Sequence, residues 1–258
     1  MSGNEPQRPV CLVTGSARRL GAAIAAQLAP HFDLAIHYRS SKDEAEQVAK
    51  RLRSENGAAQ SFQADLADPA QAAGLIPEIV RRMGRIDMVV CSASLFDYDT
   101  PSEFSAEAMQ RSLGVNLMAP MILARELAQA GSPEATLVHM LDSKVFSLNP
   151  DFFSYSLSKA AFHMIAPFLA LEYGDQGIRA FNLQPGAILT ERIIQDMGGF
   201  GFGPGYQPPE VIAEVVLWLA TNPEADAMNG QCIQGQQLCH ERGLLPGWSL
   251  PGAETVTA

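Results

Sequence analysis

The stretch that decides the fold is Thr14-Gly15-Ser16-Ala17-Arg18-Arg19-Leu20-Gly21, which joins an apolar run, 10–14, to a segment of helical period. In an open α/β sheet, a dinucleotide pyrophosphate binds at such a strand-to-helix turn, against the N-terminus of the helix. Gly15 permits the tight turn, and Gly21 permits close packing of the helix. Arg19 stands where the usual fingerprint has its middle glycine, so a plain helix-capping turn stays open as an alternative.

Outward from this turn, apolar runs of strand length alternate with longer segments of helical period along nearly the whole chain. That alternation is typical of βαβ units and a parallel sheet. It predicts one α/β domain over 1–258, a Rossmann-type doubly wound parallel sheet of about seven strands with helices on both faces. The expected strands are 10–14, 34–38, 59–63, 86–91, 135–141, 177–183 and 232–234. Pro120 and Pro167 lie inside expected helices, which they should kink or divide.

Composition narrows the class of protein. The net charge of -10, with 18 Lys+Arg against 28 Asp+Glu, argues against nucleic acid as a partner. A polar N-terminus and the lack of an apolar run of about 18 residues predict no secretory signal and no membrane span. The four cysteines are scattered over expected strands and the tail, which favours reduced thiols, no metal site and a cytoplasmic location. The tail, 240–258, is expected to be a surface extension, either for subunit contacts or as a disordered end.

The identity of the cofactor is encoded after the second strand. An acidic side chain there would bind a 2′-hydroxyl, whereas an arginine would accommodate a 2′-phosphate. Between the end of the second strand, 34–38, and Asp43 there is no Asp or Glu, and Arg18 approaches from the first loop. The residues at this place are Tyr38, Arg39 and Ser40. The sequence therefore predicts NADPH, with simple solvated charges at Arg39 and Lys42 as the alternative.

Other strand ends supply the rest of the expected cofactor site. Asp65 is placed to accept a hydrogen bond from the adenine amino group, although an exposed loop aspartate is the alternative. The small side chains of Ser92 and Ala93 would let a nicotinamide ribose approach the sheet edge. Phe96 follows, either to stack on a flat substrate or to pack into the core. The cofactor contacts predicted from these strand ends and from the first loop are Gly15, Arg18, Arg19, Leu20, Gly21, Tyr38, Arg39, Ser40, Asp65, Leu66, Ser92 and Ala93.

A candidate acid/base unit lies between Asp142 and Lys159. Tyr155 and Lys159 are four residues apart and so are neighbours on one helix face, and Asp142 lies thirteen positions before the tyrosine. A lysine ammonium beside a phenol favours the phenolate and is expected to lower the tyrosine pKa from about 10 toward the working pH. Tyr38 and Lys42 share the same offset, so the spacing alone does not decide the site.

In their order, the first-loop motif, the Asn116 helix, Tyr155 with Lys159, and Pro185-Gly186 resemble the short-chain dehydrogenase/reductase family over essentially the whole chain. The resemblance implies that Tyr155 donates a proton, while Lys159 lowers its pKa and holds the nicotinamide ribose hydroxyls. It implies that Asn116 supports a proton relay. It also adds Tyr155, Lys159, Pro185 and Gly186 to the predicted cofactor contacts. It also implies a homo-oligomer, and tetramers are common in the family.

Two features of the sequence differ from most members of that family and are similar to its pteridine reductase branch. Asp142 stands where most members have a serine, and Ser143, one residue on, would point to the other face of the strand. The first loop also carries two arginines. In that branch a phenylalanine stacks on the pterin, and a first-loop cation and a serine help to hold substrate and cofactor. The resemblance implies catalytic roles for Asp142, Tyr155, Lys159 and Asn116, and substrate contacts from Arg18, Ser94, Phe96, Asp142 and Tyr155.

The combined prediction is an NADPH-dependent reductase of dihydropterin or dihydrofolate. Such a reduction needs a hydride on carbon and a proton on the neighbouring ring nitrogen, and a carboxyl paired with tyrosine suits a nitrogen base. An NADPH-dependent ketone or 3-oxoacyl reductase is the alternative, and a non-catalytic NADPH-binding sensor is a third hypothesis. The glycine- and phenylalanine-containing run 198–205 is expected to form a substrate lid, or else a plain surface loop.

Overall fold

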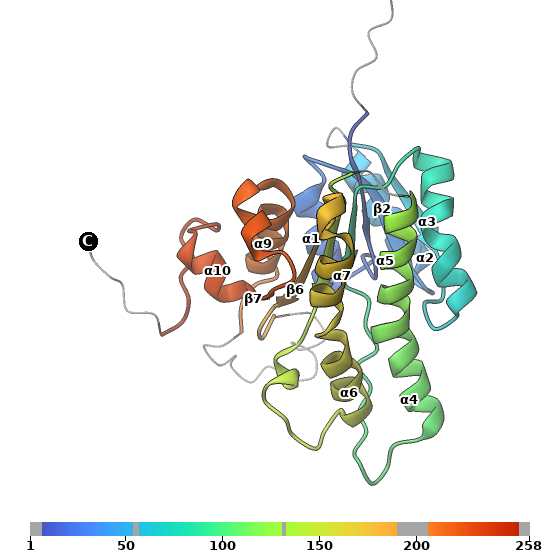
Figure 1. Ribbon diagram of the computed structural model, residues 1–258, viewed down its shortest axis with the longest axis vertical. Helices are drawn as coiled ribbons and strands as arrows, with labels where there is room; N and C mark the ends of the chain where they lie inside the picture. Colours follow the sequence, from blue (N-terminus) through green and yellow to red (C-terminus); the bar gives the residue numbers. More distant parts are fainter. Residues whose placement is uncertain (1–6, 54–56, 131–132, 190–205, 253–258) are drawn as a thin grey trace, which may run out of the picture.

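The computed structural model describes residues 7–53, 57–130, 133–189 and 206–252, so the expected lid at 198–205 lies outside the described residues. A parallel sheet of seven strands forms the centre, in the order β3-β2-β1-β4-β5-β6-β7 (Figure 1). The predicted fold class is confirmed. The strands are β1 Val10–Val13, β2 Asp33–Tyr38, β3 Ala59–Gln63, β4 Met88–Cys91, β5 Thr136–Met140, β6 Arg179–Gln184 and β7 Cys232–Gln234.

Helices cover both faces of the sheet (Figure 1). In β1, Cys11 and Val13 belong to one buried cluster, while Val10 and Leu12 belong to the other. Both faces of this strand are therefore buried, which explains why its sequence is continuously apolar and does not alternate between apolar and polar residues. The helices are α1 Arg19–Leu28, α2 Lys42–Arg53, α3 Pro69–Met83, α4 Ala106–Leu113, α5 Ala119–Ala130, α6 Phe153–Phe162, α7 Ile165–Tyr173, α9 Glu210–Thr221 and α10 Gly235–Glu241.

The strand order reverses beside β1, which pairs in parallel with β2 on one side and with β4 on the other. The connections that follow β1 and β4 leave the sheet in opposite directions, and a crevice forms at the carboxyl ends of the strands. This crevice is where the first loop and the residues after β4 come together.

Pro120 divides the predicted helix 105–129. A proline at this position cannot donate to the carbonyl of Asn116, four residues earlier. The chain widens instead into a π-helical turn, Gly114–Met118, in which the Ala119 N–H donates to the Gly114 carbonyl five residues back. The expected division is confirmed, and Asn116 lies inside the widened turn.

Pro167 has a comparable effect on the helix that carries Tyr155. The break falls one turn before the proline, at His163 and Met164, between α6 and α7. The His163 carbonyl lacks its helical donor because Pro167 has no N–H. The Asn182 side-chain amide of β6 donates to it instead, at 2.5 Å. The expected bend is therefore present and is tied to the sheet.

The end of the described chain packs on the body. A helix, α10, follows β7 directly, although the sequence predicts no helix there. Farther on, the Trp248 indole N–H donates to the Gln207 side-chain carbonyl at 2.6 Å. A surface extension beginning at residue 240 stays a prediction. Within the described ranges, the helices are too short or too polar to cross a membrane.

Candidate active site

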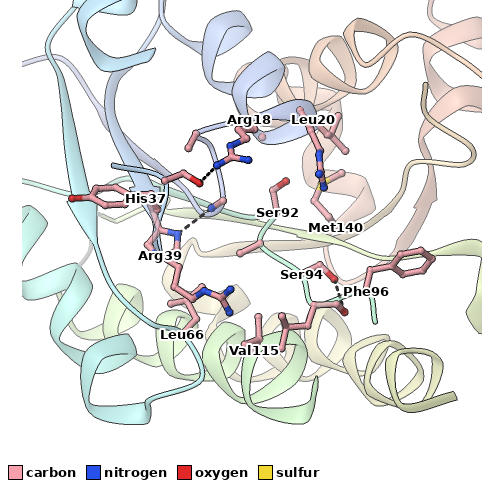
Figure 2. Close-up of a pocket in the computed structure, with 18 of the residues that line it drawn as sticks. Arg18, Leu20, His37, Arg39, Leu66, Ser92, Ser94, Phe96, Val115 and Met140 are labelled. Atoms are coloured by element: carbon pink, nitrogen blue, oxygen red, sulfur yellow. Dashed lines mark hydrogen bonds between the residues drawn. The ribbon is translucent and has the colours of Figure 1, made fainter. Parts of the chain in front are cut away.

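A cavity of about 560 Å³ opens at the carboxyl ends of the strands, across the point where the strand order reverses (Figure 2). Every predicted cofactor and substrate contact lines it, except Gly186. Three of the predicted catalytic residues, Asp142, Tyr155 and Lys159, line the cavity. The fourth, Asn116, is buried and is not among the lining residues. The lining residues that the sequence does not predict are Ala17, His37, Ser41, Leu95, Val115, Met140 and Leu141.

The first loop approaches the sheet so closely that two glycines are required. Gly15 has φ +66°, and a Cβ there would lie 3.0 Å from the Ala93 Cα. A Cβ on Gly21 would lie 2.6 Å from the Gly15 carbonyl oxygen. The predicted roles of both glycines therefore have a steric basis, and the loop leaves room above the N-terminus of α1.

Arg19 adopts the conformation of the glycine that it replaces. Its φ is +53°, in the left-handed region that side chains other than glycine rarely occupy. The side chain is exposed at the rim of the cavity. The chain thus keeps the backbone shape of a three-glycine turn and adds a cation to it.

His37 holds the first loop in place, a role that the sequence alone does not predict. Its Nδ1 accepts the Gly15 backbone N–H at 3.0 Å, and its Nε2 lies 3.1 Å from the Ala64 carbonyl. Nε2 is therefore the protonated nitrogen. Burial lowers the pKa of His37 to about 4, so the ring is neutral at physiological pH. The available signal was a polar residue at a buried position of the second strand.

Basic and hydroxyl side chains gather at one end of the cavity, beyond β2 (Figure 2). Arg18 donates to the Ser41 hydroxyl and forms an ion pair with Glu44 of α2, at 2.7 Å. It therefore points toward α2 in this structure, and its predicted contact with substrate stays a prediction. Arg39 and Ser40 are exposed beside it.

At the other end, Tyr155 and Asp142 meet as the spacing predicts. The Tyr155 hydroxyl donates to Asp142 Oδ2 at 2.6 Å. The second carboxylate oxygen accepts the Lys144 backbone N–H at 2.9 Å, which fixes the orientation of the carboxylate. Ser143 is exposed and donates to Asp142 at 3.4 Å. The aspartate, and not the neighbouring serine, is the partner of the tyrosine.

The expected lowering of the Tyr155 pKa is wrong for this structure. Burial of the phenol, followed by the charge of Asp142, raises the pKa of Tyr155 well above its usual value. The Lys159 ammonium donates to the Met140 carbonyl at 2.7 Å and lies 5.9 Å from the centre of the Tyr155 ring. Tyr155 therefore holds its proton at physiological pH and can act as a donor.

Lys159 is itself perturbed by its surroundings. Its side chain is 3% exposed, and burial lowers its pKa to about 8, against a smaller opposing effect of Asp142. An ammonium has three donors, and the Met140 carbonyl accepts one of them. Hydroxyl groups that enter the cavity could accept the others.

Asn116 forms four hydrogen bonds from a position that is 1% exposed. Its Oδ1 accepts the Leu95 N–H at 2.9 Å and the Ser94 hydroxyl at 3.1 Å. Its Nδ2 donates to the Leu95 carbonyl and to the Ser158 hydroxyl, each at 3.0 Å. The asparagine therefore joins the segment after β4 to α6, and its part in a proton relay stays a prediction. Ser158, one helical turn from Tyr155, is a contact that the sequence did not single out.

Phe96 lines the cavity and is half-buried, so it is not a core residue. Its ring stacks on Phe152 with centroids 4.1 Å apart and meets the Tyr155 ring edge-on at 4.7 Å. The sequence does not predict Phe152, whose φ of +60° is again left-handed. The Phe96 and Phe152 rings form an aromatic wall beside Tyr155.

The residues at both ends fit a dinucleotide that carries a 2′-phosphate. The glycine-lined turn at the start of α1 offers backbone N–H groups and the positive end of a helix. Among the lining residues at the end of β2 there are hydroxyls and Arg39 but no carboxylate. The donors Ser92 and Lys159 lie where a nicotinamide ribose would reach the sheet edge.

Known proteins provide an independent comparison. The family described as short chain dehydrogenase matches residues 9–196. Versicolorin reductase 1 from Aspergillus parasiticus is 30% identical over 188 residues, which cover 72% of this chain and 71% of that protein. FolM Alternative dihydrofolate reductase 1 from Brucella canis, complexed with NADP, is 32% identical, with a TM-score of 0.77 over 89% of this chain and 93% of that one.

A landomycin C-6 ketoreductase, LanV, solved with bound NADP and rabelomycin, is 26% identical, with a TM-score of 0.79 over 88% of this chain and 94% of that one. The similar proteins thus include reductases with different substrates. The family match covers well over half of the sequence, so the chain belongs to the short-chain dehydrogenase family and is an oxidoreductase.

Proposed function

We propose that this short-chain dehydrogenase is an NADPH-dependent reductase of pterins, which converts a dihydropterin or dihydrofolate to the tetrahydro form. The observation that carries the proposal is the 2.6 Å hydrogen bond between Tyr155 and the carboxylate of Asp142, at the position where the family resemblance leads one to expect a serine. The similarity to an alternative dihydrofolate reductase from Brucella canis supports the same substrate class.

NADPH is the cofactor, and when bound it supplies the hydride. The turn between Gly15 and Gly21 holds the pyrophosphate, and Arg39 with Ser40 holds the 2′-phosphate. Lys159 of α6, whose ammonium is fixed by the Met140 carbonyl at the end of β5, would donate to the ribose hydroxyls. The presence of NADP in the FolM and LanV structures supports this choice.

Tyr155 delivers the proton. Its raised pKa keeps the phenol protonated, so its hydrogen is available to a ring nitrogen that accepts negative charge as a hydride reaches the neighbouring carbon. The ammonium of Lys159 stabilises the phenolate that results. Asp142 orients the hydroxyl and provides an acceptor next to the nitrogen base. Ser94 and the face of Phe96 line the place where the flat ring lies.

Reduction of a ketone is the second candidate. A protonated Tyr155 also suits a carbonyl oxygen, and LanV, to which the chain is similar, is a C-6 ketoreductase. The intact contact between Tyr155 and Asp142, with Lys159 beside it, favours either reaction over a non-catalytic NADPH sensor.

The discriminating experiment follows NADPH oxidation with dihydrobiopterin, dihydrofolate, a quinonoid dihydropterin, a ketone panel and a 3-oxoacyl thioester. Turnover of a pterin or folate is expected. In Asp142→Ser, which restores the commoner residue, pterin turnover should fall at least about tenfold more than any ketone turnover. Clear turnover of a ketone or thioester and none of the pterins would make the second candidate correct.

We also propose that the protein assembles into a homo-oligomer, with a tetramer as the expected form. Large apolar side chains are exposed on neighbouring helices, among them Met121 of α5 and Phe168 and Leu171 of α7. A second copy of the chain would remove these side chains from water. Light scattering on the purified protein measures the assembly, and a monomer would contradict it. The cytoplasmic location stays a prediction.

A further inference from the structure

The segment that follows β4 lies along the start of α6 through several independent contacts. We call residues 92–105 the β4 loop. Besides the stack of Phe96 on Phe152, the Tyr98 hydroxyl donates to Asp151 at 3.4 Å, and the Phe104 ring meets that of Phe153 at 5.4 Å. Each contact joins a residue of the β4 loop to one of residues 151–153.

The strongest of these contacts comes from Asp99. Its Oδ1 accepts the Ser154 backbone N–H at 3.0 Å, and its Oδ2 accepts the Ser154 hydroxyl. Its carbonyl accepts the Phe153 N–H at 3.3 Å. The two backbone donors belong to the first turn of α6, whose N–H groups have no partner within the helix.

Asp99 therefore caps the N-terminus of α6, although it lies 55 residues before Ser154 in the sequence. The residue at the N-cap position itself is Phe152, which has a left-handed backbone and makes no side-chain cap hydrogen bond. Asp is among the preferred capping residues, and its negative charge is favourable at the N-terminus of a helix. The sequence gives no hint of this cap because the acceptor is distant along the chain.

The capped turn carries the proton donor. Tyr155 is the third residue of α6 and follows Ser154 directly, so fraying of this turn would displace its hydroxyl from Asp142. The β4 loop is held at its other end by Asn116, through Ser94 and Leu95. The substrate wall and the proton donor are thus parts of one fixed unit.

We propose that Asp99 is a positioning residue for Tyr155, which acts by capping α6 from the β4 loop. The proposal concerns the placement of the proton donor and holds for a pterin or a ketone as acceptor. Asp99 is not among the residues that line the cavity, and its effect passes through Ser154.

The test combines hydrogen exchange with kinetics on the full-length protein. In Asp99→Ala, backbone amides of residues 153–162 should exchange faster than in the parent, while those of residues 19–28 should not change. With whichever pterin or ketone the parent reduces, kcat should fall about 10- to 100-fold, as expected for a small displacement of a catalytic group. The Kd for NADPH, from fluorescence titration, should stay at the parent value.

Two further variants separate positioning from general destabilisation. Ser154→Ala keeps the backbone hydrogen bond and loses the hydroxyl, so its loss of kcat should be smaller. The double variant should be no slower than Asp99→Ala, because both changes remove the same interaction. Asp97→Asn, an exposed carboxylate two residues earlier, should match the parent in exchange and in kcat.

Parent-like exchange at residues 153–162 in Asp99→Ala would overturn the proposal. So would faster exchange accompanied by parent kcat, since Asp99 would then be a structural cap alone. If Asp99→Ala does not fold, Ser154→Ala decides, and a parent kcat in that variant overturns the proposal. Because the exchange measurement needs no turnover, its result is separate from the failure of the pterin assignment.

Discussion

The two ends of the cavity are built in different ways. The cofactor end consists of a backbone turn, which the buried His37 holds, and of exposed side chains, and its ion pair between Arg18 and Glu44 lies at the surface. The catalytic end consists of buried and half-buried polar groups that join one element to another, such as Asn116 to Ser158 and Tyr155 to Asp142.

The difference decides what each end can tolerate. An exposed charge contributes to ligand binding but little to folding, because water solvates it when the ligand is absent. A buried polar group that loses its partner is costly to the fold as well as to the reaction. Changes of exposed side chains at the cofactor end should therefore alter affinity alone, whereas changes at the catalytic end should alter turnover, stability or both.

The largest expected effect is at the catalytic end. Tyr155→Phe removes the donated proton, so kcat should fall by about 10²- to 10⁴-fold. The Kd for NADPH, measured by fluorescence titration, should not change, because the phenyl ring keeps its packing. Tyr173→Phe, at the end of α7, is the matched control and should keep the parent kcat. Parent turnover in Tyr155→Phe would favour the sensor hypothesis.

A smaller effect is expected at the cofactor end. Arg39→Ala should raise the Kd for NADPH about 10- to 100-fold, the contribution of hydrogen bonds to a charged group, with little change in that for NADH. At saturating cofactor, kcat and the melting temperature should match the parent. Arg81→Ala removes an exposed ion pair with Glu78 on α3 and serves as the control. A lower melting temperature in Arg39→Ala would break the distinction between the two ends.

A pH titration should separate activity from stability at the catalytic end. Lys159 loses its charge as the pH rises through about 8, so kcat/KM should fall about tenfold per pH unit above that value. In the unfolded chain the lysine stays protonated up to about pH 10.4, so the unfolded state binds more protons in this window. The contribution of Lys159 to stability therefore rises with pH as activity falls. A melting temperature that falls in parallel with kcat/KM would contradict this assignment.

The smallest effects concern two glycines. Gly21→Ala places a Cβ against the Gly15 carbonyl and should destabilise the fold by about 1–3 kcal/mol. Gly74→Ala, in the interior of α3 with nothing within 4 Å, should stabilise it by about 0.5–1 kcal/mol. Thermal unfolding checks both, at roughly 2–4 °C per kcal/mol for a domain of 150–250 residues. An unchanged melting temperature for Gly21→Ala would mean that the first loop can shift.

Local pattern was sufficient to predict the sheet. The predicted strands 59–63 and 232–234 agree with β3 and β7 residue for residue, because turn residues and short apolar runs set strand limits locally. The prolines correctly located two interruptions of helices. The π-helical form of the first was not predictable, since it depends on how Asn116 is held by the β4 loop and by Ser158.

The residues of the candidate site could be predicted where a sequence motif contains them. Spacing identified Asp142, Tyr155 and Lys159, whose contacts lie within one strand–helix unit. It did not identify Asp99 or His37, whose partners are fixed only by the tertiary structure. Nor could it give the direction of the Tyr155 pKa, which depends on burial and on Asp142 more than on the neighbouring lysine.

The left-handed backbone at Arg19 has a consequence for protein engineering. A residue other than glycine in this conformation costs roughly 1–2 kcal/mol. A laboratory selection for heat resistance would therefore favour Arg19→Gly, which relaxes the turn and completes the usual glycine pattern. The same change would remove a cation from the rim of the cavity. In directed evolution of this chain, each round should consequently be screened for cofactor affinity as well as for thermal stability.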